Sequence, residues 1–85
     1  MYTMNLYLLL QNSIRGYDTY DSMVIAAPSA MEAIEVHPDG NLIKNMGWRQ
    51  GDDWPAYSDI DEIKVEFLDT TTHKAGVILA SFNAG

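Results

Sequence analysis

The sequence contains no cysteine, only five basic residues and no apolar run long enough to cross a membrane. Without cysteine, neither disulfide bonds nor thiolate metal sites can hold the fold, so packing or self-association must stabilise it. A membrane helix needs about 20 consecutive apolar residues, whereas the apolar run near the N-terminus ends at Leu10. No base precedes Arg15, which argues against a signal peptide. These absences predict a cytoplasmic protein.

The scarcity of bases also restricts the partners. Twelve acids against five bases give a net charge of -7. A negative charge of this size repels phosphate backbones and anionic lipids. The bases form no cluster along the chain: they are Arg15, Lys44, Arg49, Lys64 and Lys74. The sequence therefore predicts neither direct nucleic-acid binding nor membrane binding.

Residues with catalytic potential are few. Nucleophilic catalysis needs an activated serine, cysteine or lysine beside an oriented base, and the chain has only two histidines. His37 is expected to close a helix and His73 to lie in a polar turn, so a structural role is favoured for both. No glycine-rich turn leads into a helix to hold a phosphate group. The sequence predicts a protein that is not an enzyme and has no cofactor.

A metal site is the least favoured chemical alternative. The carboxylate pairs that could bind a hard cation are Asp52–Asp53 and the Asp59–Asp61–Glu62 group. A calcium loop needs alternating acids, then a glycine and a distal glutamate. The order of residues here, interrupted by Trp54 and Pro55, does not match that pattern. No metal is predicted.

The hydrophobic pattern predicts one α+β domain over residues 1–85, with 47% hydrophobic residues. We expect strands at 4–10, 22–27, 62–68 and 77–82, in the order β-β-α-β-β. Ser29 and Glu32 form a capping box that starts a helix, and Pro38 ends it. A small antiparallel sheet of about four strands would carry this one helix on one face. The expected core is Leu6, Leu8, Leu10, Val24, Ala33, Ile34, Ile63, Val65, Phe67, Ile78 and Leu79.

The long connection at 38–57 and the segment after it combine acids with aromatic residues. Seven of the twelve acids lie between Asp52 and Asp69, with Lys64 as the only base among them. Such a run is often only a solvated face, but tryptophan and tyrosine are favoured where proteins bind each other. The candidate partner-binding residues are Trp48, Asp52, Asp53, Trp54, Tyr57, Asp59, Asp61 and Glu62.

A second candidate lies at the first predicted turn, where two Tyr-Asp pairs follow Gly16. These residues either contribute to an interface or pack under the hairpin and shape its turn. Both interpretations remain open for Tyr17, Asp18, Tyr20 and Asp21.

Several stretches resemble small acidic proteins of bacteriophages and other mobile elements, a group that includes anti-CRISPR proteins and other inhibitors of host defence. The similar stretches are 6–9, 16–22, 26–29, 37–38 and 76–83. The resemblance implies a non-enzymatic inhibitor in the bacterial cytoplasm. Its partner would be a bacterial protein complex with a basic surface, such as a CRISPR or other nucleic-acid-processing complex. The alternative is a small homo-oligomeric structural protein, for example a homodimer paired through an edge strand at 77–82.

Overall fold

The computed structural model describes residues 3–14 and 18–83, with the side chains of 82 and 83 left undescribed. Four strands form one antiparallel sheet: β1 (Met4–Leu10), β2 (Thr19–Ala27), β3 (Lys64–Thr71) and β4 (Gly76–Asn83). Their spatial order is β3-β1-β2-β4, so β1 and β2 are central and β3 and β4 are edge strands. The prediction of a small four-stranded antiparallel sheet is confirmed.

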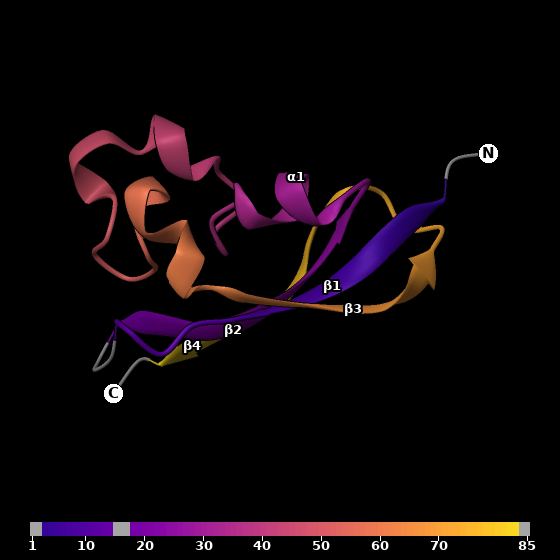
Figure 1. Cartoon of the computed structure of the whole chain (residues 1–85), viewed down its shortest axis with the longest axis horizontal. Coiled ribbons are helices and arrows are strands. Elements are labelled where there is room, and N and C mark those ends of the chain that lie inside the picture. Colours follow the sequence, from indigo (N-terminus) through magenta and orange to yellow (C-terminus); the bar gives the residue numbers. More distant parts are fainter. Residues whose placement is uncertain (1–2, 15–17, 84–85) are drawn as a thin grey trace.

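The helical part of the fold is more divided than one helix. The helix α1 (Ala30–Ile34) is followed by three short 3-10 helices: η1 (Ile43–Asn45), η2 (Gly47–Arg49) and η3 (Tyr57–Glu62). All four lie on the same side of the sheet (Figure 1). The prediction of a single helix over the sheet is therefore only partly right.

The capping box starts α1 at the expected place. The Ser29 hydroxyl oxygen accepts a hydrogen bond from the Glu32 backbone N–H at 3.3 Å. The helix ends earlier than Pro38, because Glu35 caps it and Val36 forms an isolated antiparallel bridge with Leu42. His37 donates its backbone N–H to the Asn41 carbonyl at 2.7 Å. A tight turn therefore replaces the last helical turn that we expected.

The hydrophobic core lies between the sheet and the helical layer. Alternate strand residues point into it, with Tyr7 and Leu9 from β1 and Met23, Ile25 and Ala27 from β2. The layer contributes the remaining buried residues of the same cluster, which are Ala33, Ile43, Trp54 and Ile63.

The predicted core was wrong for most sheet residues. Ala33 and Ile63 are buried, and Ile34 and Val65 pack partly against the core. The other predicted core residues of the sheet point to the uncovered side or stay exposed: Leu6, Leu8, Leu10, Val24, Phe67, Ile78 and Leu79. The physical reason is that β1 and β2 are apolar at odd and even positions alike, so their pattern could not identify the buried face.

Candidate protein-binding surface

Residues 42–62, which we call the loop layer, cover one end of the sheet (Figure 1). Two buried side chains, Ile43 and Trp54, anchor this layer in the core. Backbone hydrogen bonds add to the anchoring: Ile43 N–H donates to the Glu35 carbonyl and Tyr20 N–H donates to the Asp53 carbonyl, both at 2.9 Å. The long connection is therefore a packed structural layer.

Trp54 has a core role in place of the surface role that we expected. Its side chain is 1% exposed, so it offers a partner no contact area in this conformation. Its indole Nε1–H has no hydrogen-bond acceptor among the described residues. The indole belongs to the core cluster between the loop layer and the sheet, and the next residue, Pro55, is buried as well.

Asp53 is also mainly structural. Its carboxylate lies 2.7 Å from the Nε2 atom of His37, whose residue is only 2% exposed. The Nδ1 atom of His37 accepts a hydrogen bond from the Asp39 backbone N–H at 3.0 Å. The same nitrogen lies 3.1 Å from the Oδ1 atom of Asp39, so a carboxylate stands beside each ring nitrogen of His37. The contact between His37 and Asp53 connects the turn after α1 to the loop layer.

Two neighbouring groups complete this cluster around His37. The Tyr20 ring meets the imidazole edge to face, with the ring centroids 5.5 Å apart. Burial, together with the charges of Asp53 and Asp39, raises the pKa of Tyr20. Burial opposes ionisation of Asp39, but hydrogen bonds from Asn41 and the nearby His37 outweigh it and lower the Asp39 pKa. Arg49 also approaches the Asp39 carboxylate, at 3.7 Å.

The cluster does not form an accessible reaction centre. The His37 side chain is 3% exposed, so a substrate cannot reach either ring nitrogen in this conformation. Within residues 3–14 and 18–83, no three His, Asp or Glu side chains are arranged to hold a metal ion. What the cluster does is fix the position of the loop layer on β2.

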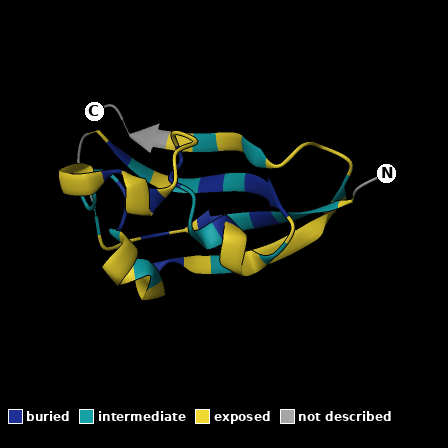
Figure 2. Cartoon of the chain, turned by 90° about the horizontal axis from the view of Figure 1, so that it is seen from above, coloured by how far each residue is buried: buried dark blue, intermediate teal, exposed yellow. Residues whose placement is uncertain are grey.

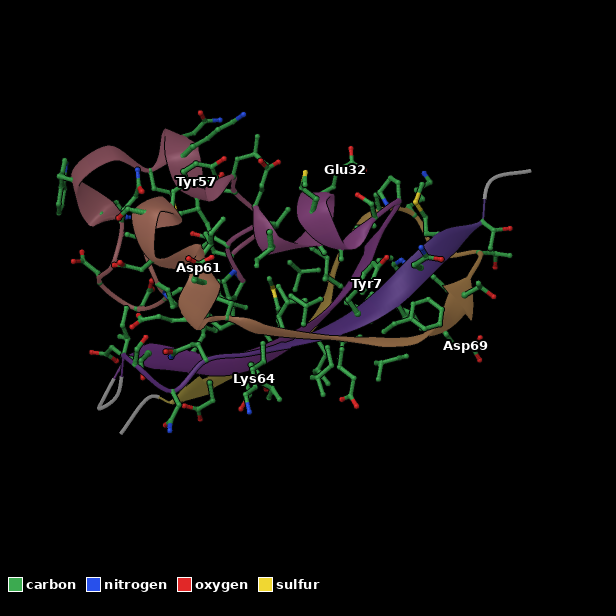
Figure 3. All side chains as sticks on the ribbon, in the orientation of Figure 1. Tyr7, Glu32, Tyr57, Asp61, Lys64 and Asp69 are labelled. Atoms are coloured by element: carbon green, nitrogen blue, oxygen red, sulfur yellow. The ribbon has the colours of Figure 1, made fainter. Side chains whose placement is uncertain are left out.

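The outer surface of the loop layer keeps the other candidates. Trp48 stands in η2 with 86% of its surface exposed. Tyr57 is partly exposed, and its orientation is fixed by a hydrogen bond from its phenol to Glu35 at 3.4 Å. Exposed carboxylates accompany them on the same layer: Asp52, Asp59, Asp61 and Glu62. Figure 3 shows Tyr57 and Asp61 together at this end of the molecule.

These four carboxylates lack counter-charges. In the part of the chain that the structure describes, none of them forms an ion pair. The one base of the layer that does pair, Arg49, is directed at Asp39. The loop layer therefore carries an exposed indole, a tyrosine and four carboxylates without ion-pair partners. We call this set of residues the acidic aromatic surface: Trp48, Asp52, Tyr57, Asp59, Asp61 and Glu62.

The first turn offers less surface for binding than the loop layer. Tyr17 lies outside the described residues, and Tyr20 packs against His37. Asp18 and Asp21 are exposed, and Asp18 has the positive φ of 61° that aspartate tolerates better than most residues. For Tyr20 and Asp18, the turn-shaping interpretation agrees with the geometry.

Gln11 organises this turn, a role that sequence reasoning missed. It is 7% exposed, and its amide nitrogen donates to the Ile14 and Tyr20 carbonyls, each at 2.7 Å. Its side-chain oxygen accepts from the Ser13 and Ile14 backbone N–H groups. A glutamine in a polar turn carries no sequence signal for such a role.

No protein-family model matches the sequence, and no curated protein or solved structure matches it either. Among the described residues, no helix has the length and apolar character needed to span a membrane.

Proposed function

We propose that this chain is a non-enzymatic binding protein that engages a basic protein surface through its acidic aromatic surface. The observation that carries the proposal is Trp48, which stays 86% exposed on a layer whose inner side chains are well packed. Tryptophan is among the residues most enriched at binding hot spots, because it buries a large area at small entropic cost. Uncompensated carboxylates around it would speed association with a cationic partner.

The partner that suits this surface is a bacterial complex that processes nucleic acid. Such complexes hold their substrate in a positively charged channel, and carboxylates can stand where phosphates would lie. The net charge of -7 and the similarity in format to small phage proteins support this choice. The proposed protein is thus a phage-type inhibitor of a CRISPR or other defence complex, acting in the bacterial cytoplasm.

Paired variants in a capture experiment test the acidic aromatic surface. Immobilised wild-type protein, W48A and D52K would be exposed to bacterial lysate, and captured proteins would be quantified by mass spectrometry. Two substitutions of similar type away from the loop layer serve as controls: M31A on α1 and D69K on β3. We expect one bacterial protein complex to be retained by wild type and both controls and lost with W48A and D52K.

The captured complex should also lose its nucleic-acid substrate when wild-type protein is added, as measured by an electrophoretic mobility assay. Equal capture by W48A, D52K and the controls would contradict the proposed surface. Capture without displacement of nucleic acid would contradict the inhibitor function and leave protein binding intact.

A second candidate function is a homo-oligomeric structural protein of a phage or mobile element. The side of the sheet that the described residues leave uncovered favours self-association. The two functions are compatible because the acidic aromatic surface and the uncovered side lie on opposite sides of the sheet.

A further inference from the structure

The sheet has one side that no described helix or loop covers. In Figure 1 all helical segments lie above the sheet, and no described segment lies below it. Figure 3 shows Lys64 projecting toward this lower side, whereas Tyr7 projects toward the helical layer. We call the lower side the bare face.

The strand registers identify the side chains of the bare face, because residues directly opposite each other in antiparallel strands share a face. A central row crosses all four strands as Glu66, Leu8, Val24 and Leu79. The row on one side of it contains Lys64, Leu10, Ser22 and Ser81, and the row on the other side contains Asp69, Leu6, Ala26 and Gly76.

Two register shifts add more apolar surface. Leu68 follows Phe67 at the irregularity in β3, and Ile78 follows Val77 at the irregularity in β4. Phe67 and Val77 pair with Tyr7 and Ile25, which point into the core, so alternation places Leu68 and Ile78 on the bare side. Both are exposed, and Leu79, which follows Ile78 on β4, is 66% exposed.

A contiguous apolar face of this kind is unusual for a monomer. Its exposed apolar residues are Leu10 on β1, Leu68 on β3, and Ile78 and Leu79 on β4, and the half-buried Leu8 and Val24 lie between them on the central strands. Sheets in small domains bury such faces against a helix or a second sheet. The helices of this chain all lie on the other side.

We propose that the bare face binds a second copy of this chain, forming a two-fold symmetric dimer of two sheets packed face to face. This inference deepens the second candidate function named above, and it does not depend on the acidic aromatic surface because it uses the opposite side of the sheet. Three observations favour a second copy over another partner: the area of the face, the layout of its charges and the position of the acidic loop layer.

The area meets the lower requirement for a specific dimer. Four strands about 4.8 Å apart and about eight residues long, rising about 3.3 Å per residue, give a face of about 500 Å². Complete overlap of two such faces would bury at most about 1,000 Å² in total, near the lower limit for a specific interface. We therefore expect a reversible dimer with a dissociation constant on the order of micromolar.

The charges of the bare face include one self-complementary pair. Lys64 and Glu66 of β3 point to the same side and Asp69 follows, while Asp21 of β2 lines a shallow pocket together with Leu10 and Lys64. A two-fold axis that crosses the strands places β3 over β3 of the partner, running in the opposite direction. Lys64 of one copy then lies opposite Glu66 of the partner subunit, and the reciprocal pair forms as well. The same axis places Leu10 opposite Leu8 of the partner subunit, and it places Val24 and Leu79 opposite Ser22 and Ser81 of the partner subunit.

The net negative charge of each copy also favours packing through the bare faces. Each copy carries a net charge of -7, so two copies repel unless their acids are kept apart. The backbone of the loop layer lies on the side of the sheet away from the bare face. Face-to-face packing places the two loop layers at the outer ends of the dimer, where both remain free to bind.

The test is the molar mass measured by light scattering after size-exclusion chromatography, over loading concentrations from about 5 to 500 µM, which bracket the expected micromolar dissociation constant. We expect the mass to rise with concentration from the 9.5 kDa of one chain toward twice that value. The variant L79K places a charge on an already exposed position of β4 and should weaken the dimer at least tenfold. M31K, on α1 at a position that is 76% exposed, is the matched control and should dimerise like wild type.

A second variant separates face packing from edge pairing. Leu8 lies on the central strand β1, so L8K should not disturb a dimer that forms between edge strands. The substituted side chain would lie opposite Glu66, and this pair of opposite charges should help the monomer to stay folded. Circular dichroism verifies that L8K and L79K stay folded. We expect both to be monomeric. A wild type that stays monomeric at 500 µM, or a dimer that survives both substitutions, would overturn the proposal.

The charge arrangement has its own check. K64E puts two like charges opposite each other across the proposed axis and should weaken the dimer several-fold, and K64E combined with E66K should restore it. Failure of the double variant to restore association would overturn the placement of β3 over β3. None of these outcomes affects capture through the loop layer, so the two proposals fail separately.

Discussion

The two tryptophans of this chain should respond to substitution in opposite ways. W54A removes a side chain that is 1% exposed and contacts the core cluster, whereas W48A removes one that is 86% exposed. An aromatic side chain buries about 150–250 Å². At about 25 cal/mol per Å², burial of Trp54 is worth about 4–6 kcal/mol. Measured costs of truncating a buried tryptophan to alanine are similar, at about 3–5 kcal/mol.

That cost is large for a domain of this size. At about 0.05–0.15 kcal/mol per residue, an 85-residue domain has a free energy of unfolding of about 4–13 kcal/mol. W54A therefore removes between about a quarter and all of the stability. W48A should change it by no more than about 0.5 kcal/mol, as is usual for exposed positions.

Urea denaturation followed by far-ultraviolet circular dichroism measures both changes, because it does not depend on tryptophan fluorescence. Fluorescence of the single-tryptophan variants adds an independent assay. W48F, which retains Trp54, should show blue-shifted emission that acrylamide quenches poorly, and W54F should show the reverse. A folded W54A with nearly wild-type stability would refute the assignment of Trp54 to the core.

Three further predictions concern the cluster around His37 and the first turn. The folded-state pKa of Tyr20 is raised above its ordinary value of 10.0, so its contribution to stability should be complete below pH 10 and fall as the pH rises further. Urea midpoints measured between pH 8 and 11 should show this fall in stability. In Y20F the fall should be smaller. The folded-state pKa of Asp39 is lowered from 3.8, so its carboxylate should contribute to the free energy of unfolding above that pH and lose this contribution in stronger acid. A D39N variant whose stability falls as steeply as that of wild type between pH 5 and 2 would contradict this. Q11A removes a buried amide that holds the β1–β2 turn and should cost about 1–3 kcal/mol in urea denaturation, against no measurable loss for the exposed control N45A.

Local features of the fold could be predicted because adjacent residues determine them. The capping box at Ser29 and Glu32 depends on residues three apart, and the alternation of Ile63 and Val65 gives the buried side of β3 correctly. The face of β1 could not be predicted in this way. Leu6 and Leu8 compete with Tyr7 and Leu9 as core residues, and only the position of the helical layer decides between them.

The candidate site illustrates the same limit. Trp48 and Trp54 are six residues apart in one loop, and composition gives no reason to place one outside and one inside. The bond between His37 and Asp53 joins residues 16 positions apart through the fold of the loop layer. Such pairings depend on tertiary structure, so the sequence could indicate an acidic aromatic segment but not which of its members face a partner.

The orientation of the layer has a consequence for binding strength. If each copy presents its acidic aromatic surface outward, a dimer through the bare face offers two such surfaces at once. A partner with two basic sites within reach would then bind more tightly by avidity. L79K should lower the apparent affinity for such a partner while leaving the affinity of each single site unchanged.

The most direct test of the central claim is the dissociation constant of the captured complex measured against salt concentration. An acidic surface that binds a basic partner should lose affinity steeply as exposed charges are screened, by about tenfold or more between 50 and 500 mM NaCl. D52K should bind more weakly at low salt and show a smaller salt dependence than wild type. An affinity that is independent of salt and unchanged by D52K would contradict the claim that the acidic aromatic surface is the binding site.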